Sequence, residues 1–250
     1  MSGHSKWSQI KYKKAMTDAQ KGRLFTKLAN AITLAAREGG DPEANFKLKA
    51  AIEKAKEQNM PTANIERAIK RGTGELEGAR IEEATYEGYG PAGVALLISV
   101  ITDNKNRAVG EIRSILNKAG GKLGQPGSVA YLFEQKGVIH LEVASTHQEE
   151  AALLAIDAGA EDISSGEGAL FVYTKPNELF LVKKNLEEKG LKVLSASLSM
   201  EPKTTVKIGD LETARQVLKM MDALDECQDV ANVSANFDIP DEVIHQVSGD

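Results

Sequence analysis

The chain has 250 residues, of which 42% are hydrophobic and 27% are charged, and its formal net charge is −5 at pH 7. This length suits about two or three domains, and the composition is ordinary for a soluble globular protein. The single cysteine, Cys227, excludes a disulfide framework and suits a reducing compartment.

The charge is divided unevenly along the chain. Residues 1–71 contain 15 Lys and Arg against 7 Asp and Glu, which gives this segment a net charge of +8. Residues 72–250 contain the remaining 16 basic and 29 acidic residues, a net charge of −13. We therefore expect the first segment to attract phosphates and the acidic remainder to repel polyanions.

The first region of predicted regular structure is helical. From Gly22 apolar residues recur at helical spacing, and Gly39-Gly40 ends this helix. Asp41-Pro42 provides an N-cap and a proline at the first helical position of a second helix. Pro61 begins a third helix, which Gly72-Thr73-Gly74 ends. Three helices with short connections predict a small bundle.

A second region starts near Ile81 with an alternating strand, a glycine-rich turn and the apolar run from Val94 to Ile101. The eight residues of this run are too few to span a bilayer, so we interpret it as a buried strand. Gly88, Gly90 and Gly93 match the dinucleotide-binding pattern G-x-G-x-x-G, but they lead into a strand and not into a helix that would hold a pyrophosphate. We interpret them as a hairpin turn that uses left-handed backbone at its glycines.

Further along this region, Asp103 is predicted to cap a helix that ends at Gly120-Gly121, and residues 128–133 are predicted to form another strand. Asp210 is predicted to cap a later helix. Residues 231–237 then alternate apolar and polar side chains, as in a strand with one face in water.

Residues 135–203 interrupt this second region with a pattern of their own. Their order is strand, helix, strand, strand, helix, strand, which is the ferredoxin-like plan. We therefore predict an α+β multidomain protein, with a three-helix bundle and two α/β sandwich domains, one of them ferredoxin-like and inserted in the other. The predicted domains are a basic extension with the helical bundle (1–78), an α/β domain (79–134 with 204–250) and the inserted domain (135–203).

Catalysis has little support in the sequence. The histidines His4, His140, His147 and His245 are scattered among a tail, a strand, a helix start and the C-terminal segment. No H-E-x-x-H, C-x-x-C or G-x-x-x-x-G-K-[ST] motif is present, and Cys227 has no histidine near it in the sequence. We therefore expect no enzyme activity, no metal and no cofactor.

Nucleic-acid binding has more support. Residues 1–16 show no clean periodicity, so we expect disorder or a fraying extension there. Residues 1–27 contain seven Lys and Arg and one acidic residue, Asp18, and Trp7 and Tyr12 lie among the basic residues. This combination suits nucleic-acid binding, because the cations can neutralise a phosphate backbone and the aromatic rings can stack on bases. A solvated lysine-rich tail is the alternative, and the segregation of charge favours binding.

A second candidate segment is the predicted helix start at residues 104–107, because helix N-termini favour anions. A polar loop with a cap explains this segment equally well. The candidate nucleic-acid-binding residues are Lys6, Trp7, Lys11, Tyr12, Lys13, Lys14, Lys21, Arg23, Lys27, Lys70, Arg71, Asn104, Asn106 and Arg107.

Several motifs together resemble the YebC/PmpR family, which includes a mitochondrial translational activator of cytochrome c oxidase. The motifs are His4-Ser5-Lys6-Trp7, Gly22-Arg23-Leu24-Phe25-Thr26-Lys27-Leu28, Asn59-Met60-Pro61 with Asn64-Ile65 and Arg67-Ala68-Ile69, Tyr86-Glu87-Gly88-Tyr89-Gly90-Pro91, Thr102-Asp103-Asn104 with Asn106-Arg107, and Gly124 with Gly127-Ser128-Val129. The match covers essentially the whole chain. The resemblance implies one helical and two α/β domains with a cavity between them, and a cytoplasmic regulator of gene expression.

The resemblance leaves the nucleic acid open. The family has been classed as DNA-binding transcription regulators, which favours that function, although the bundle lacks an obvious recognition helix for base edges. Some relatives act in translation on the ribosome, so a ribosome-associated factor or translational activator that binds ribosomal RNA is the alternative. A sensor or enzyme that uses an interdomain cleft around Tyr89 and Arg107 is a third hypothesis, without a catalytic constellation to support it.

The expected location is the cytoplasm. The polar start from Met1 to Ser8 has no apolar segment of a secretory signal peptide, and it is lysine-based and not arginine-rich as a mitochondrial transit peptide would be. We expect nucleic acid and no membrane as partner. The sequence does not decide the oligomeric state, although it favours a monomer over an oligomer.

Overall fold

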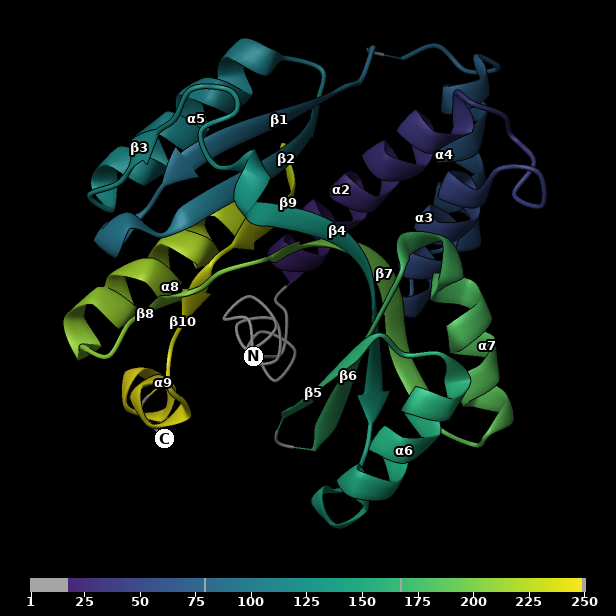
Figure 1. Cartoon of the computed structure of the whole chain (residues 1–250). Coiled ribbons are helices and arrows are strands. Elements are labelled where there is room, and N and C mark those ends of the chain that lie inside the picture. The colour runs from purple at the N-terminus through teal and green to yellow at the C-terminus, as the bar shows by residue number, and fades with distance from the viewer. Residues whose placement is uncertain (1–17, 79, 167, 249–250) are drawn as a thin grey trace.

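The computed structural model describes residues 18–78, 80–166 and 168–248 of the chain (Figure 1). These residues form an α+β protein with a three-helix bundle, a central antiparallel sheet and a ferredoxin-like unit inserted between the strands of the central sheet. The domain boundaries after residues 78, 134 and 203 stay a prediction. Within the described part, no helix combines the length and the apolar character needed to cross a membrane.

The bundle consists of α2 (Asp18–Ala36), α3 (Phe46–Glu57) and α4 (Thr62–Thr73), which confirms the three predicted helices. Apolar positions at helical spacing place one face of each helix in a small core rich in alanine. The core includes Leu28, Ile32, Ala36, Leu48, Ile52, Ala55, Ile65 and Ala68. α4 approaches α2 closely at Gly72, where an added Cβ would lie 2.4 Å from the carbonyl oxygen of Thr33.

The start of α3 differs from the prediction at Asp41-Pro42. The helix begins at Phe46, and its N-cap is Asn45, whose side-chain oxygen accepts the N–H of Leu48 at 3.0 Å. The amide nitrogen of Asn45 also donates to two carbonyl oxygens at the end of α2, each at 2.8 Å. Asn45 therefore caps one helix and holds the end of another, a tertiary role that local sequence rules do not detect.

The central sheet has the strand order β3-β1-β2-β9, with antiparallel neighbours throughout. Its strands are β1 (Glu82–Tyr89), β2 (Ala95–Thr102), β3 (Lys122–Leu123) and β9 (Val230–Ala235). The helices α5 (Lys105–Lys118) and α8 (Leu211–Glu226) pack on one face (Figure 1). The core between them includes Leu96, Ile98, Ile112, Leu116, Val217 and Leu224, which confirms the predicted buried strand.

The C-terminal segment extends this unit. β8 (Val206–Lys207) and β10 (Phe237–Asp238) form a two-stranded parallel sheet, and α9 (Asp241–Ser248) contacts α8. The predicted N-cap of α8 is confirmed, because the carboxylate of Asp210 accepts the N–H of Thr213 at 2.8 Å.

The second face of the central sheet is covered as well. α2 contacts β2 and β9, and Val129 packs against this face. Ser234 and Asn236 are only 2% and 4% exposed, and the side-chain oxygen of Asn236 accepts the N–H of Ala95 at 2.7 Å. The prediction that the polar side of residues 231–237 faces water is therefore wrong at Ser234 and Asn236, which other parts of the chain cover, whereas Asn232 is exposed.

The inserted unit has the ferredoxin-like order that the sequence predicts. Its elements are β4 (Phe133–Glu142), α6 (Gln148–Ala158), β5 (Asp162–Gly166), β6 (Ala169–Thr174), α7 (Leu179–Glu188) and β7 (Lys192–Pro202). The sheet order is β5-β6-β4-β7 with antiparallel neighbours, and both helices pack on one face (Figure 1). The core between them includes Ile139, Leu141, Ala155, Leu170, Val172, Val182 and Leu186.

The glycine-rich segment after β1 forms a hairpin turn, as predicted. Tyr89 pairs with Ala95 across the hairpin, and Pro91–Gly93 form a short 3-10 turn between them. Gly93 has a φ of 76° in the left-handed region. Gly90 serves packing instead, since an added Cβ would lie 2.7 Å from the Cε of Met220 on α8.

Residues 128–133 do not form the predicted strand. The segment contains a 3-10 helix, Ala130–Leu132, and β4 begins only at Phe133. The carboxylate of Glu87 on β1 accepts the N–H groups of Gly127 and Val129, each at 2.6 Å, and that of Ala130 at 2.9 Å. N–H groups that bond to a carboxylate are not available to a neighbouring strand, so this charge decides the local conformation.

The bundle contacts the ferredoxin-like unit through α3. The rings of Phe46 and Phe180 meet edge to face with centroids 4.7 Å apart. Lys183 Nζ lies 3.3 Å from a carboxylate oxygen of Glu53, and these two side chains are 19% and 34% exposed. α3 therefore joins the bundle to α7 through one aromatic contact and one ion pair.

Candidate nucleic-acid interface

The first part of the candidate interface lies near the start of α2. Lys21 and Arg23 are exposed there, and in residues 18–78, 80–166 and 168–248 no carboxylate lies within ion-pair distance of either. Lys6, Trp7, Lys11, Tyr12, Lys13 and Lys14 lie outside the described residues. Two predicted cations of α2 are thus open to solvent.

Lys27 has a different environment from its neighbours on α2. Its Nζ donates to the carbonyl oxygen of Asp225, near the C-terminal end of α8, and its side chain is half-buried. The contact joins the bundle to the central sheet unit. A cation at a helix C-terminus is also favoured by the negative end of the helix dipole.

Lys70 and Arg71 lie in the last turn of α4, and both are exposed. α4 and α2 run in the same direction, since the hydroxyl of Thr33 donates to the carbonyl oxygen of Ala68, and Gly72 touches Ala36. The two cations therefore lie at the end of the bundle opposite to Lys21 and Arg23.

The third part of the candidate interface is the start of α5. Asn104, and not Asp103 as predicted, is the N-cap of this helix, because its side-chain oxygen accepts the N–H of Arg107 at 3.0 Å. Asn106 is exposed in the first turn. Asp103 instead contacts the side chain of Arg107, which leaves the cap to its neighbour.

Arg107 is held by two carboxylates. Its Nε and Nη2 donate to the two carboxylate oxygens of Asp229 at 3.0 and 2.8 Å, and Nη2 also lies 2.9 Å from Asp103. The Asp229 side chain is 5% exposed, whereas that of Arg107 is 45% exposed. These hydrogen bonds, first to Asp229 and then to Asp103, raise the pKa of Arg107. The bidentate pair fastens α5 to the segment before β9.

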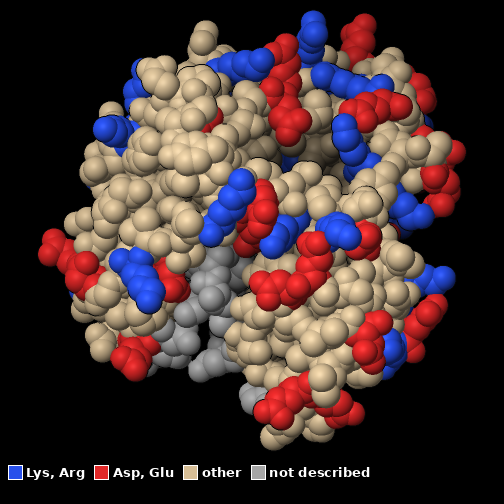
Figure 2. Space-filling model, viewed as in Figure 1, with Lys and Arg blue, Asp and Glu red and all other residues tan. Residues whose placement is uncertain are grey.

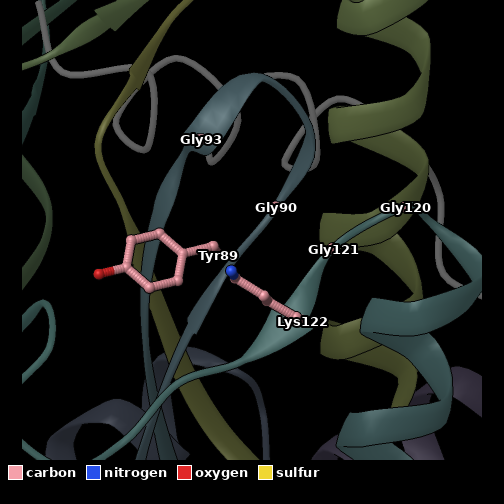
Figure 3. A pocket seen from close by; sticks show the side chains of 6 residues that line it. All are labelled: Tyr89, Gly90, Gly93, Gly120, Gly121 and Lys122. Atoms are coloured by element: carbon pink, nitrogen blue, oxygen red, sulfur yellow. The ribbon is translucent and has the colours of Figure 1, made fainter.

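A hollow of about 540 Å³ lies at the hairpin end of the central sheet (Figure 3). Gly90, Gly93, Gly120 and Gly121 form most of its wall, and Tyr89 and Lys122 contribute its two larger side chains. Lys122 Nζ lies 5.9 Å from the centroid of the Tyr89 ring. Arg107 follows the other end of β2, so the structure does not bring Tyr89 and Arg107 into one cleft as the third hypothesis expects.

Cys227 and His140, two side chains that the sequence offers for catalysis, are buried and half-buried, respectively. Cys227 is buried and donates to a carboxylate oxygen of Glu111 at 3.1 Å; burial first, and then this bond, raise the pKa of its thiol to about 11. His140 stacks on Phe171, and burial lowers the pKa of its imidazole. In the described part of the chain, no group of three or more His, Cys, Asp or Glu could hold a metal ion.

Two family models match this chain. The one described as the TACO1/YebC protein N-terminal domain matches residues 5–75, and the one described as the TACO1/YebC second and third domain matches residues 81–237. The chain belongs to the TACO1/YebC family. This result confirms the YebC/PmpR resemblance that the sequence motifs indicate.

Individual relatives match the TACO1/YebC chain over its full length. A protein of Rubrobacter xylanophilus is 55% identical over 251 residues and covers 100% of both chains. A protein of Aquifex aeolicus is 50% identical over 248 residues, 99% of this chain and 100% of its own. Both are named probable transcriptional regulatory protein. The crystal structure of a conserved hypothetical protein, Aq1575, from Aquifex aeolicus has a TM-score of 0.83 at 49% identity and covers 92% of this chain and 96% of its own.

The structure adds two cations that sequence reasoning missed in this TACO1/YebC protein. Arg37 and Arg80 line the same hollow as Arg71, although Arg37 directly follows α2 and Arg80 lies in the segment before β1. The face in Figure 2 is hollowed where the bundle meets the central sheet, with basic and acidic side chains around the opening. The sequence signal was weak, because single arginines at a helix end and in a linker are common on solvated surfaces.

Proposed function

We propose that this TACO1/YebC protein is a nucleic-acid-binding regulator of gene expression whose helical bundle binds the phosphate backbone. The finer assignment is a DNA-binding transcriptional regulator, which the names of the relatives favour. The proposal includes a cytoplasmic location, a monomer and no catalytic activity of its own.

One observation carries this proposal. Among the described residues, the cations Lys21, Arg23, Lys70 and Arg71 of the bundle are exposed and have no carboxylate at ion-pair distance. The bundle lies within the segment of net charge +8, whereas the rest of the chain carries −13. Unpaired cations on one region of an otherwise acidic protein attract a polyanion and orient it toward that region.

Ribosomal RNA is the second candidate partner. The four cations that carry the proposal, Lys21, Arg23, Lys70 and Arg71, lie near the ends of two helices. That arrangement suits contacts to phosphates, which position a nucleic acid without reading its bases. Recognition by backbone and shape is the usual mode for structured RNA, so a ribosome-associated translation factor is physically as compatible as a DNA-binding regulator.

Salt-dependent binding of the full chain tests the proposal. Wild-type protein is titrated with a fluorescent DNA duplex, a structured RNA and purified ribosomes over a series of salt concentrations. If about four cations contact phosphates, log K falls with log[salt] with a slope of about −3 to −4. The double variant Lys21→Ala/Arg23→Ala is expected to reduce that slope by about 1.5 to 2 units.

The matched control is Lys184→Ala/Lys189→Ala, which removes two exposed cations from α7 and the residue after it. It is expected to bind like the wild type. Ribosome binding that exceeds DNA binding by orders of magnitude would contradict transcriptional regulation and favour the second candidate. No binding to any of the three probes would contradict the whole proposal.

A further inference from the structure

A hollow of about 720 Å³ lies between the C-terminal ends of α2 and α4 and the segment that joins α4 to β1. Three arginines line it: Arg37 directly after α2, Arg71 from α4 and Arg80 from the joining segment. We call it the arginine hollow. It is built by three separate parts of the chain, so its charge arises only in the folded protein.

The arginine hollow is positively charged. Among the residues that the structure describes, its lining contains one acidic residue, Glu77, and three guanidinium groups, so positive charge is in excess. Arg80 lies 3.6 Å from Glu82 but its side chain is 86% exposed, so this ion pair is weak. In the described part of the chain, neither Arg37 nor Arg71 has a carboxylate within ion-pair distance.

The fold holds two of these three arginines, Arg37 and Arg71, in place. Arg37 Nη1 donates to the carbonyl oxygen of Ile81, which ties the end of α2 to the start of the central sheet. The joining segment passes directly over Arg71, since a Cβ added to Gly78 would lie 2.9 Å from the Cδ of Arg71. Both helices end at the hollow, and their negative dipole ends favour cations there. Arg37 and Arg71 are thus positioned before any ligand arrives.

The hollow is aligned with the other cations of α2. Arg23 and Arg37 are 14 residues apart, which places them about 21 Å from each other along α2 and within about 40° of the same helix face. Residues 24–36 between these two arginines are buried or half-buried, so a polyanion that binds at both places contacts the molecule at the two ends of α2. A small anion cannot reach both places.

We propose that the arginine hollow binds a phosphate group of the same nucleic-acid strand that contacts Arg23 at the other end of α2. Planar guanidinium groups match phosphate oxygens in a bidentate way, which explains arginine and not lysine at all three positions. Because the hollow joins the bundle to the segment before β1, a bound phosphate also fixes the bundle against the central sheet. This inference rests on the proposed function, since it assigns a second contact to the same nucleic acid.

The test uses full-length protein and the double variant Arg71→Ala/Arg80→Ala. Arg37 is left intact because its bond to Ile81 supports the fold. The control is again Lys184→Ala/Lys189→Ala, with the same loss of charge. Binding of a fluorescent single-stranded RNA and of a DNA duplex, each longer than the 21 Å spacing along α2, is measured at several salt concentrations, together with binding of a dinucleotide and of inorganic pyrophosphate.

The hollow variant is expected to bind the longer strands about tenfold more weakly, with a salt slope shallower by about 1 to 2 units, while the control is unchanged. The dinucleotide, which cannot span the spacing, is expected to bind weakly to all proteins. A hollow variant with the affinity and slope of the wild type overturns the inference; the proposed function then depends on the other exposed cations of the bundle and is tested by the Lys21→Ala/Arg23→Ala variant. If the wild-type protein binds no strand, both the inference and the proposed function are overturned. If, in that case, the wild type and the control bind pyrophosphate and the hollow variant does not, the hollow is a site for a free phosphate compound.

Discussion

The helical bundle and the central sheet unit use charged side chains in different ways. Arg71 at the end of α4 is exposed and has no carboxylate partner among the described residues. Arg107 at the start of α5 is almost as close to a helix end, yet Asp229 and Asp103 bind its guanidinium. Arg71 therefore remains open to solvent, whereas Arg107 holds α5 to the segment before β9.

The difference shows that the position of a charge along a helix does not define its role. The sequence makes both arginines candidates for nucleic-acid binding. The difference between them comes from Asp229, which binds Arg107 and lies 122 residues after it in the sequence. A guanidinium that a buried carboxylate already binds has less capacity for phosphate, so we expect Arg71 to contribute more to nucleic-acid affinity than Arg107.

The largest effect is expected for Glu87→Gln, which removes the charge that holds the loop before β4. An amide has only one acceptor oxygen, and its NH₂ group would face backbone N–H groups that now bond to a carboxylate. We expect a loss of about 2 to 3 kcal/mol in the free energy of unfolding, measured with urea. Glu83→Gln, an exposed change on the same strand, is the control and is expected to cost less than about 0.5 kcal/mol.

The same residue predicts a pH dependence. Burial acts to raise the pKa of Glu87, but the N–H bonds of Val129, Gly127 and Ala130 outweigh it and hold the pKa below its ordinary value. A lowered pKa in the folded state stabilises the protein above the unfolded pKa of about 4.3, and this contribution is lost as pH falls through the folded pKa. The stability difference between wild type and Glu87→Gln should therefore shrink below about pH 4. A difference that stays constant down to pH 3 would contradict the role of the ionised carboxylate.

A direct comparison of the two arginines is expected to give the next largest effect. Arg107→Ala leaves the 5% exposed carboxylate of Asp229 without its bidentate partner. We expect the free energy of unfolding to fall by about 2 kcal/mol. The loss is not larger because Arg107 is 45% exposed, so water can reach the site and solvate the carboxylate. Arg71→Ala should change stability by less than about 0.5 kcal/mol. Urea unfolding and oligonucleotide binding are measured for both. Equal stability losses would remove the distinction between the two regions.

The smallest effect is expected where the two kinds of region meet, at Lys183 and Glu53. The pair is partly exposed, so a double-mutant cycle with Lys183→Ala and Glu53→Ala should give a coupling of about 0.5 to 1 kcal/mol. A coupling near zero would leave the rings of Phe46 and Phe180 as the main contact between α3 and α7.

Local patterns were enough to predict most helices and strands, and they failed where a distant residue decided the outcome. Asp41 was the better local candidate for the cap of α3, but Asn45 also holds the end of α2. Residues 128–133 have the composition of a strand, but Glu87 binds their N–H groups. In both cases a tertiary hydrogen bond outweighed a preference of a few tenths of a kcal/mol to about 1 kcal/mol.

The candidate site shows the same limit. Lys21, Arg23, Lys70 and Arg71 could be proposed from the sequence because charge density is a property of composition. Arg37 and Arg80 could not, because nothing local distinguishes them from solvated arginines. Only the meeting of two helix ends with the joining segment places them beside Arg71.

The sequence by itself determined the family, the helical bundle, the ferredoxin-like order and the separation of basic from acidic segments, since periodicity, turn residues and charge are read along the chain. The tertiary structure alone decided which charges are paired and which face solvent. The physical reason is range: a hydrogen bond or ion pair acts over about 3 to 4 Å in space, whatever the distance in sequence.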